Sequence, residues 1–160
     1  GTSFEIYLRR ANSLAGGGVE PCQSAEDLNK VYQKRRTVLV VEDNRDLQRI
    51  NVMALESANF RALTASNVTQ ALDKLDQNQD IDLVLSDIVM PGQLSGIDLA
   101  ERMGTEHPAI PIILTSGYSE LGELSGDDRW RRFPFLKKPY RPKELLVLIS
   151  KVIGEFTEDR

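Results

Sequence analysis

The sequence predicts an α/β protein in which a doubly wound, five-stranded parallel sheet carries helices on both faces. Two patterns predict this class. Strand-like and helix-like segments alternate five times between residues 37 and 153. The strand-like segments are almost continuously apolar, as expected for parallel strands that are buried on both faces. The length of 160 residues suits one such domain with an appendage.

The five expected strands are short apolar runs that end at polar or turn residues. The first, TVLVV, is rich in valine, whose branched side chain favours extended backbone. In chain order the strands are residues 37–41, 60–65, 81–86, 110–116 and 133–138.

Four regular helices are expected between or after these strands, at residues 44–58, 66–78, 95–107 and 141–153. Apolar spacing predicts which side chains face inward. In the first helix these are Leu47, Ile50, Met53, Ala54 and Leu55, and in the second Val68, Ala71, Leu72 and Leu75. Residues 117–132 have two internal glycines and little apolar content, which predicts a short or irregular helix in which Trp130 is exposed.

Residues 1–36 differ in character and are expected to be an N-terminal appendage. Residues 4–8 (FEIYL) alternate like a short strand, residues 12–21 are typical of a linker, and residues 24–36 favour a short helix capped by Ser24. We therefore predict an appendage at 1–36, a domain at 37–156 and a tail at 157–160.

Composition excludes several classes of protein. No apolar run approaches the roughly 20 residues that span a bilayer, and Cys22, the only cysteine, rules out an internal disulfide or a cysteine-based zinc site. Six basic and four acidic side chains give residues 1–36 a charge of +2, whereas 14 basic and 20 acidic give the remainder −6. An acidic domain argues against direct nucleic-acid binding. We expect a cytoplasmic location.

Polar side chains follow four of the expected strands. Glu42-Asp43 follows the first strand, Asp87 the third, Thr115-Ser116 closes the fourth, and Lys137-Lys138 closes the fifth. The carboxyl ends of parallel strands form the ligand-binding edge of such sheets. Carboxylates gathered there repel one another, and a divalent cation with hard oxygen ligands, such as Mg²⁺, would relieve the repulsion.

This set of groups is suited to phosphoryl transfer. A carboxylate beside Mg²⁺ can attack a phosphoryl group to form an acyl phosphate, while the metal, a lysine and a hydroxyl neutralise the phosphoryl oxygens. Each residue alone has a structural explanation: Asp43 as a helix cap, Asp87 as the start of a turn, and Lys137-Lys138 as a solvated turn. Their convergence on one edge favours the phosphoacceptor hypothesis.

Four segments, VLVVEDN, LVLSDIVMPG, PIILTSGY and FLKKPY, resemble the signature segments of response-regulator receiver domains over residues 37–156. The resemblance implies the flavodoxin-like strand order 2-1-3-4-5. It also implies that Asp87 is the phosphoacceptor, and that Asp43 and the Val89 carbonyl bind Mg²⁺ directly. Glu42 would assist through water.

By the same resemblance, Lys138 contacts the phosphoryl group and Phe135 is the switch aromatic. The switch hydroxyl falls on Ser116 when counted from Pro111, with Thr115 as the adjacent alternative. The sequence departs from the family pattern in a loop, MPGQLSG, that is one residue longer than usual, and in a Glu-Asp acidic pair.

The first eight residues, GTSFEIYL, resemble the last segment of the ATP-binding domain of sensor histidine kinases. The two resemblances together imply the C-terminal receiver of a bacterial hybrid sensor histidine kinase, without the kinase active site. Its partner would be a phosphohistidine donor, either a histidine kinase or a histidine phosphotransfer protein, and a homodimer is a further hypothesis. The competing functions are a metal-dependent hydrolase, against which Val89 stands where a second aspartate is expected, and a degenerate docking receiver.

Overall fold

The computed structural model describes residues 35–117 and 127–158. The expected strand at 4–8 and nearly all of the expected helix at 24–36 lie outside these ranges. The described residues belong to one compact unit. No helix in the described part of the chain has the length and apolar character needed to cross a membrane.

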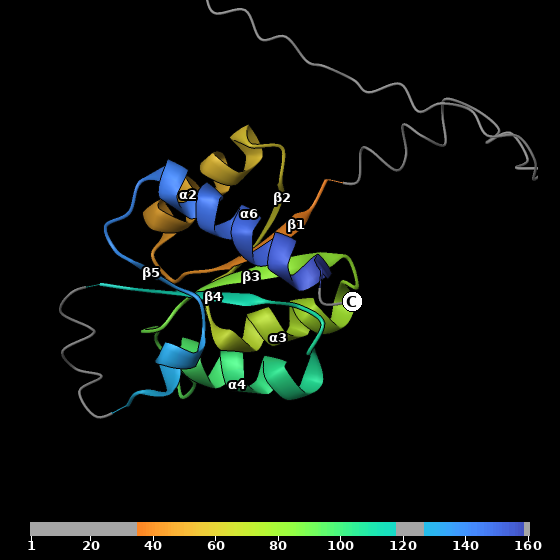
Figure 1. Ribbon diagram of the computed structural model, residues 1–160. Coiled ribbons are helices and arrows are strands. Elements are labelled where there is room, and N and C mark those ends of the chain that lie inside the picture. The colour runs from red at the N-terminus through yellow and green to blue at the C-terminus, as the bar shows by residue number, and fades with distance from the viewer. Residues whose placement is uncertain (1–34, 118–126, 159–160) are drawn as a thin grey trace, which may run out of the picture. The chain divides into compact units, whose positions relative to one another are not determined.

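The described chain alternates strands and helices as the sequence predicts (Figure 1). In order, the elements are β1 (Thr37–Val41), α2 (Arg45–Ser57), β2 (Arg61–Ala65), α3 (Val68–Gln77), β3 (Ile81–Asp87), α4 (Gly96–Glu106), β4 (Ile112–Ser116), the 3₁₀ helix η1 (Arg129–Arg132), β5 (Phe135–Lys137) and α6 (Pro142–Glu158).

All strand pairs are parallel, and the strand order is β2-β1-β3-β4-β5. This confirms the predicted fold class and strand order. β4 and β5 begin two residues later than expected, after Pro111 and Pro134, since proline has no N–H to donate to a ladder. α6 extends to Glu158, five residues beyond its expected end at Ile153.

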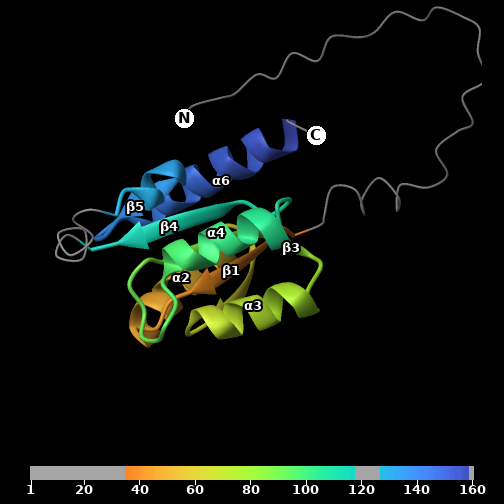
Figure 2. The same ribbon diagram turned by 90° about the horizontal axis from the view of Figure 1, so that it is seen from below.

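The sheet lies between two helical layers. α3 and α4 cover one face, and α2 and α6 cover the other (Figures 1 and 2). Alternate strand residues belong to different cores: Leu39 and Val84 pack with α3 and α4, whereas Val40 and Leu85 pack with α2 and α6. Both faces of every central strand are therefore buried, which explains the continuous apolar runs in the sequence.

The expected inward face of α2 is partly wrong. Ala54 and Leu55 are buried, but Leu47, Ile50 and Met53 are 38%, 53% and 62% exposed. At about 100° per residue, Met53 lies roughly 160° around the helix from Leu55, so both cannot face the sheet. In α3 the prediction is confirmed: Val68, Ala71 and Leu75 are buried and Leu72 is half-buried.

The segment before β5 contains the short helix η1, and residues 118–126 of the expected irregular helix lie outside the described ranges. The expected exposure of Trp130 is wrong. Its ring is half-buried and lies 4.8 Å, centre to centre, from the ring of Phe135. The apolar core beneath α4 accounts for the difference, because Trp130 and Phe135 both pack against it.

Candidate functional site

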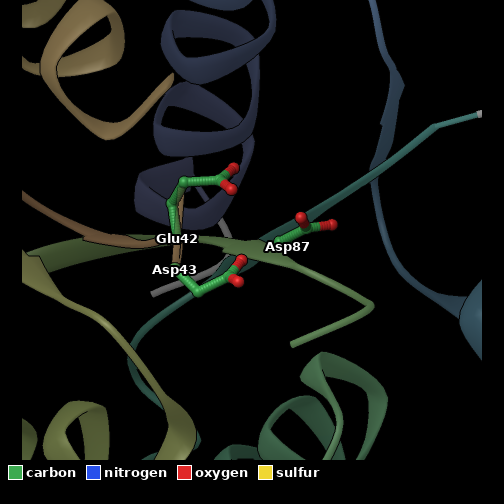
Figure 3. A group of neighbouring side chains, drawn as sticks. All are labelled: Glu42, Asp43 and Asp87. Carbon is green, nitrogen blue, oxygen red and sulfur yellow. The ribbon is translucent and has the colours of Figure 1, made fainter. Parts of the chain in front are cut away.

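Three carboxylates meet at the carboxyl edge of the sheet. Glu42 and Asp43 follow β1, and Asp87 ends the neighbouring strand β3; one carboxylate oxygen of each lies within 4.8 Å of the others (Figure 3). They border a pocket of about 480 Å³, which is also lined by Asn44, Leu47, Val89, Met90, Pro91 and Lys138.

The end of β1 is held by hydrogen bonds to β2 and α2. The Glu42 amide donates to the Ala65 carbonyl at 3.0 Å. The side-chain amide of Gln48 donates to the carbonyls of both Glu42 and Ala65, at 2.9 and 3.1 Å. These bonds fix the backbone from which the acidic pair projects. Gln48 was not predicted from the sequence, in which only its place one turn into the helix points to this role.

Asn44, not Asp43, caps α2. The Asn44 side chain accepts hydrogen bonds from the amides of Asp46 and Leu47. Capping is therefore not the role of the Asp43 carboxylate, which is exposed and borders the pocket. In contrast, Glu42 and Asp87 are only 3% and 4% exposed.

The backbone of Asp87 lies against the start of α4. The Gly96 amide donates to the Ile88 carbonyl at 2.9 Å, and a Cβ on Gly96 would collide with the Asp87 carbonyl oxygen. Only glycine fits this close approach. Gly96 was not among the residues predicted from the sequence, although a glycine directly after the capping residue Ser95 was a signal available there.

Lys138, which directly follows the edge strand β5, bridges two of the carboxylates. Its Nζ lies 2.8 Å from Glu42 Oε2 and 2.6 Å from Asp87 Oδ2, and its amide donates to the Ser116 carbonyl at 2.8 Å. Burial alone would lower the pKa of Lys138, but the hydrogen bonds to Asp87 and Glu42 outweigh it and hold that pKa above its usual value. Lys138 is therefore an ammonium ion in this site.

Thr115 and Ser116 are both buried, but they face opposite sides of the sheet. Ser116 follows Leu114 by two residues, and Leu114 pairs with Phe135, so Ser116 and Phe135 share the face covered by α4. Thr115 faces the other layer, where its hydroxyl donates to the Ser86 carbonyl at 3.4 Å. This geometry puts Ser116, and not Thr115, on the same face as the aromatic ring.

The structure thus brings together Glu42, Asp43, Asp87 and Lys138, and Val89 also lines their pocket. Lys137 is exposed. Three carboxylates and one ammonium leave two net negative charges in a small volume. A hard divalent cation would neutralise these charges, so the donor set suits one.

Comparison with known proteins is consistent with this arrangement. Residues 38–150 match the family described as response regulator receiver domain. The chain is 31% identical to the response regulator receiver protein CpdR of Brucella abortus, over 74% of this chain and 97% of CpdR. It is 30% identical to the sensor kinase CckA of the same organism, over 96% of this chain but only 16% of the kinase.

Solved structures agree in fold. A response regulator receiver domain protein from Clostridium thermocellum superposes with a TM-score of 0.69 at 26% identity, covering 78% of this chain and 98% of that one. The chain therefore spans nearly the whole length of some relatives and about a sixth of the sensor kinase.

Proposed function

The chain belongs to the response regulator receiver domain family of two-component systems, and on that premise we propose that it accepts a phosphoryl group from a phosphohistidine onto Asp87. Receiver domains accept phosphoryl groups from histidine kinases or phosphotransfer proteins. The observation that carries the assignment is the position of Asp87, which lines a pocket beside Glu42 and Asp43 and lies within hydrogen-bond distance of Lys138.

The proposed metal is Mg²⁺, which receiver domains generally bind through acidic residues. Asp43, Asp87 and the Val89 carbonyl would hold it, with Glu42 acting through water. When bound, the ion supplies positive charge for the phosphoryl oxygens. The two net negative charges of the cluster support this proposal.

In the proposed transfer an oxygen of Asp87 attacks the phosphorus atom. The P–N bond of the phosphohistidine breaks and its electron pair returns to the imidazole, which leaves an acyl phosphate on Asp87. Lys138 then exchanges its contact with Asp87 Oδ2 for a phosphoryl oxygen. The ammonium stays beside Glu42 and neutralises charge that develops during transfer.

The proposed donor is a protein. Its histidine would have to reach the pocket, which Leu47 of α2 lines. Leu47 is the first of three exposed apolar side chains along α2, and the other two are Ile50 and Met53. Exposed apolar rows of this kind are typical of protein interfaces. This row supports a protein phosphodonor that seats beside the pocket.

Ser116 and Phe135 are proposed as the switch pair. After phosphorylation, the Ser116 hydroxyl would move toward Asp87 and Phe135 would turn inward, which shifts a pre-existing equilibrium between two states. Their position on the same face of neighbouring strands supports the pair.

We further propose that the chain is the C-terminal receiver of a hybrid histidine kinase, with the appendage at 1–36 and the receiver at 37–156, and that the receiver lies in the cytoplasm whether or not the parent kinase is anchored in a membrane. The similarity to the sensor kinase CckA, which extends over 96% of this chain, supports this context. The similarity to CpdR supports the alternative of a separate regulator.

The test is a labelling experiment on the full chain. Incubation with Mg²⁺ and acetyl phosphate should add one phosphoryl group to the intact mass, and Asp87→Asn should abolish the gain. Asp73→Asn, which changes an exposed aspartate on α3, is the matched control and should label like the wild type. Persistent labelling of the Asp87 variant would disprove the assignment.

A titration tests the metal. Asp43→Asn should weaken Mg²⁺ binding, as measured by isothermal titration calorimetry. An unchanged affinity would mean that the metal binds elsewhere.

A further inference from the structure

The segment at residues 127–132 packs an aromatic side chain against the proposed switch residue. Trp130 and Phe135 have ring centres 4.8 Å apart and ring planes inclined at 51°, a tilted geometry that aromatic pairs favour. Both rings pack against the core beneath α4. Any turn of Phe135 must therefore change its contact with Trp130.

Two arginines fasten this segment to α4. Arg129 Nη1 lies 2.8 Å from Glu101 and 3.4 Å from Asp98, and Arg132 Nη2 lies 2.7 Å from Glu101. Arg131 differs from both, since it pairs with Asp128 at 3.0 Å, and its guanidinium lies 5.5 Å from the centre of the Trp130 ring. The Arg129 and Arg132 ion pairs thus hold Trp130 in place from α4, on either side of it.

The same helix is anchored to Asp87. Gly96 at the start of α4 lies against the Asp87 and Ile88 backbone, and Asp98 closes the capping box with Ser95. Asp98 therefore joins the start of α4 to Arg129. A movement of the Asp87 strand end would act on the 127–132 segment through α4, and on Phe135 through the adjacent strands β4 and β5.

We propose that residues 127–132 form a latch that opposes the switch. Its ion pairs to α4 keep Trp130 against Phe135, so any turn of Phe135 away from its resting position must disturb that contact. The proposal rests on the proposed function, because it gives Phe135 the switch role. The latch sets the resting balance between the two states, and phosphorylation of Asp87 has to overcome it.

The first test uses Trp130 as its own reporter. Addition of beryllofluoride, a phosphoryl mimic, to the full chain with Mg²⁺ should change the Trp130 emission. Asp87→Asn should show no such change. Fluorine NMR measures beryllofluoride binding independently of Trp130.

The second test weakens the latch without touching the pocket. Arg129→Gln and Arg132→Gln should each lower the beryllofluoride concentration at half-saturation by roughly two- to fivefold, the range expected when an exposed ion pair no longer favours the resting state. Arg102→Gln is the matched control, because it removes an exposed guanidinium that pairs with Glu106 within α4 and leaves the ties between α4 and residues 127–132 intact. Circular dichroism checks that all three variants are folded.

The outcomes separate this proposal from the one on which it rests. If Asp87 binds beryllofluoride by NMR and Trp130 emission stays constant, the latch is disproved and the phosphoacceptor assignment stands. The latch is equally disproved if the three arginine variants share one half-saturation point, or if the Arg129 and Arg132 variants bind more weakly. If Asp87 neither binds beryllofluoride nor gains mass from acetyl phosphate, the phosphoacceptor function is wrong and the latch falls with it.

Discussion

The chain contains two clusters in which basic side chains pair with acidic ones. The clusters differ mainly in how deeply their side chains are buried. Lys138, Glu42 and Asp87 have side chains only 15%, 3% and 4% exposed, and they join β5 to β1 and β3. Arg129, Glu101 and Asp98 are 42%, 37% and 33% exposed, and they join η1 to α4. The residue types are similar, but the electrostatic consequences are not.

Burial determines what each cluster contributes. Moving charges out of water costs more than a buried pair usually returns, so such a pair is weak evidence for stability and better evidence for chemistry. Exposed pairs remain solvated and are screened by salt, so they adjust an equilibrium only slightly. The buried cluster is therefore suited to a chemical reaction. The exposed cluster is suited to adjusting the equilibrium between two conformational states.

The largest effect should come from Lys138→Met. It leaves Glu42 and Asp87 buried without their cation, which should lower the free energy of unfolding by about 3 kcal/mol in urea without Mg²⁺. Mg²⁺ should recover part of the loss. Lys137→Met, which changes the exposed neighbouring lysine, is the control, and an equal loss in both variants would contradict the comparison.

The contribution of Lys138 should also depend on pH. Because its folded pKa is raised, the stabilisation is complete below the ordinary lysine pKa of 10.5 and is lost as pH rises through the higher folded value. The free energies of unfolding of the wild type and of Lys138→Met, measured in urea, should therefore become equal only above pH 10.5. Convergence near neutral pH would show that the bridge contributes nothing.

Gly96→Ala probes the contact between α4 and the site. The added methyl group would meet the Asp87 carbonyl oxygen, so either the helix or the strand end must shift, at about 2 kcal/mol. Gly104→Ala, on the same helix with open space around it, should be neutral or stabilising, since alanine favours helix. Equal stability of the two variants would remove the argument for close approach.

Asp98→Ala removes the carboxylate that accepts a hydrogen bond from the Ser95 amide in the capping box of α4. The loss should lower the free energy of unfolding by about 1 kcal/mol near neutral pH. Hydrogen bonds from the Ser95 backbone and hydroxyl, with a smaller effect of Arg129, hold the pKa of Asp98 below 3.8. Its stabilisation is therefore present above pH 3.8 and is lost as pH falls through the folded pKa. The difference between wild type and variant in urea unfolding should vanish in acid, and a constant difference would contradict this origin.

The smallest effect on stability should come from Arg129→Gln, because its ion pairs are exposed. The shift in urea midpoint should be slight at low salt and should vanish at about 1 M salt, where screening acts over roughly 3 Å. The loss caused by Lys138→Met should survive the same salt concentration. Equal salt sensitivity of the two variants would remove the distinction between the clusters.

The corrections to the sequence-based expectations concern contacts that local patterns do not encode. Met53 and Leu55 are both apolar helix residues, and only packing against the sheet and α6 decides that Leu55 is buried and Met53 exposed. Trp130 is surrounded by arginines in the sequence, yet it packs on Phe135 because η1 returns the chain to the core beneath α4.

The sequence by itself determined the fold class, the strand order through family resemblance, and the residues that end the strands. Continuous apolar runs and the polar residues after them are local features, and parallel topology places every such end at one edge. Tertiary structure alone decided that Lys138 contacts Glu42, 96 residues away, that Ser116 and Thr115 face opposite layers, and that Gly96 must lack a side chain. These depend on register and close packing between distant segments, which no local pattern specifies.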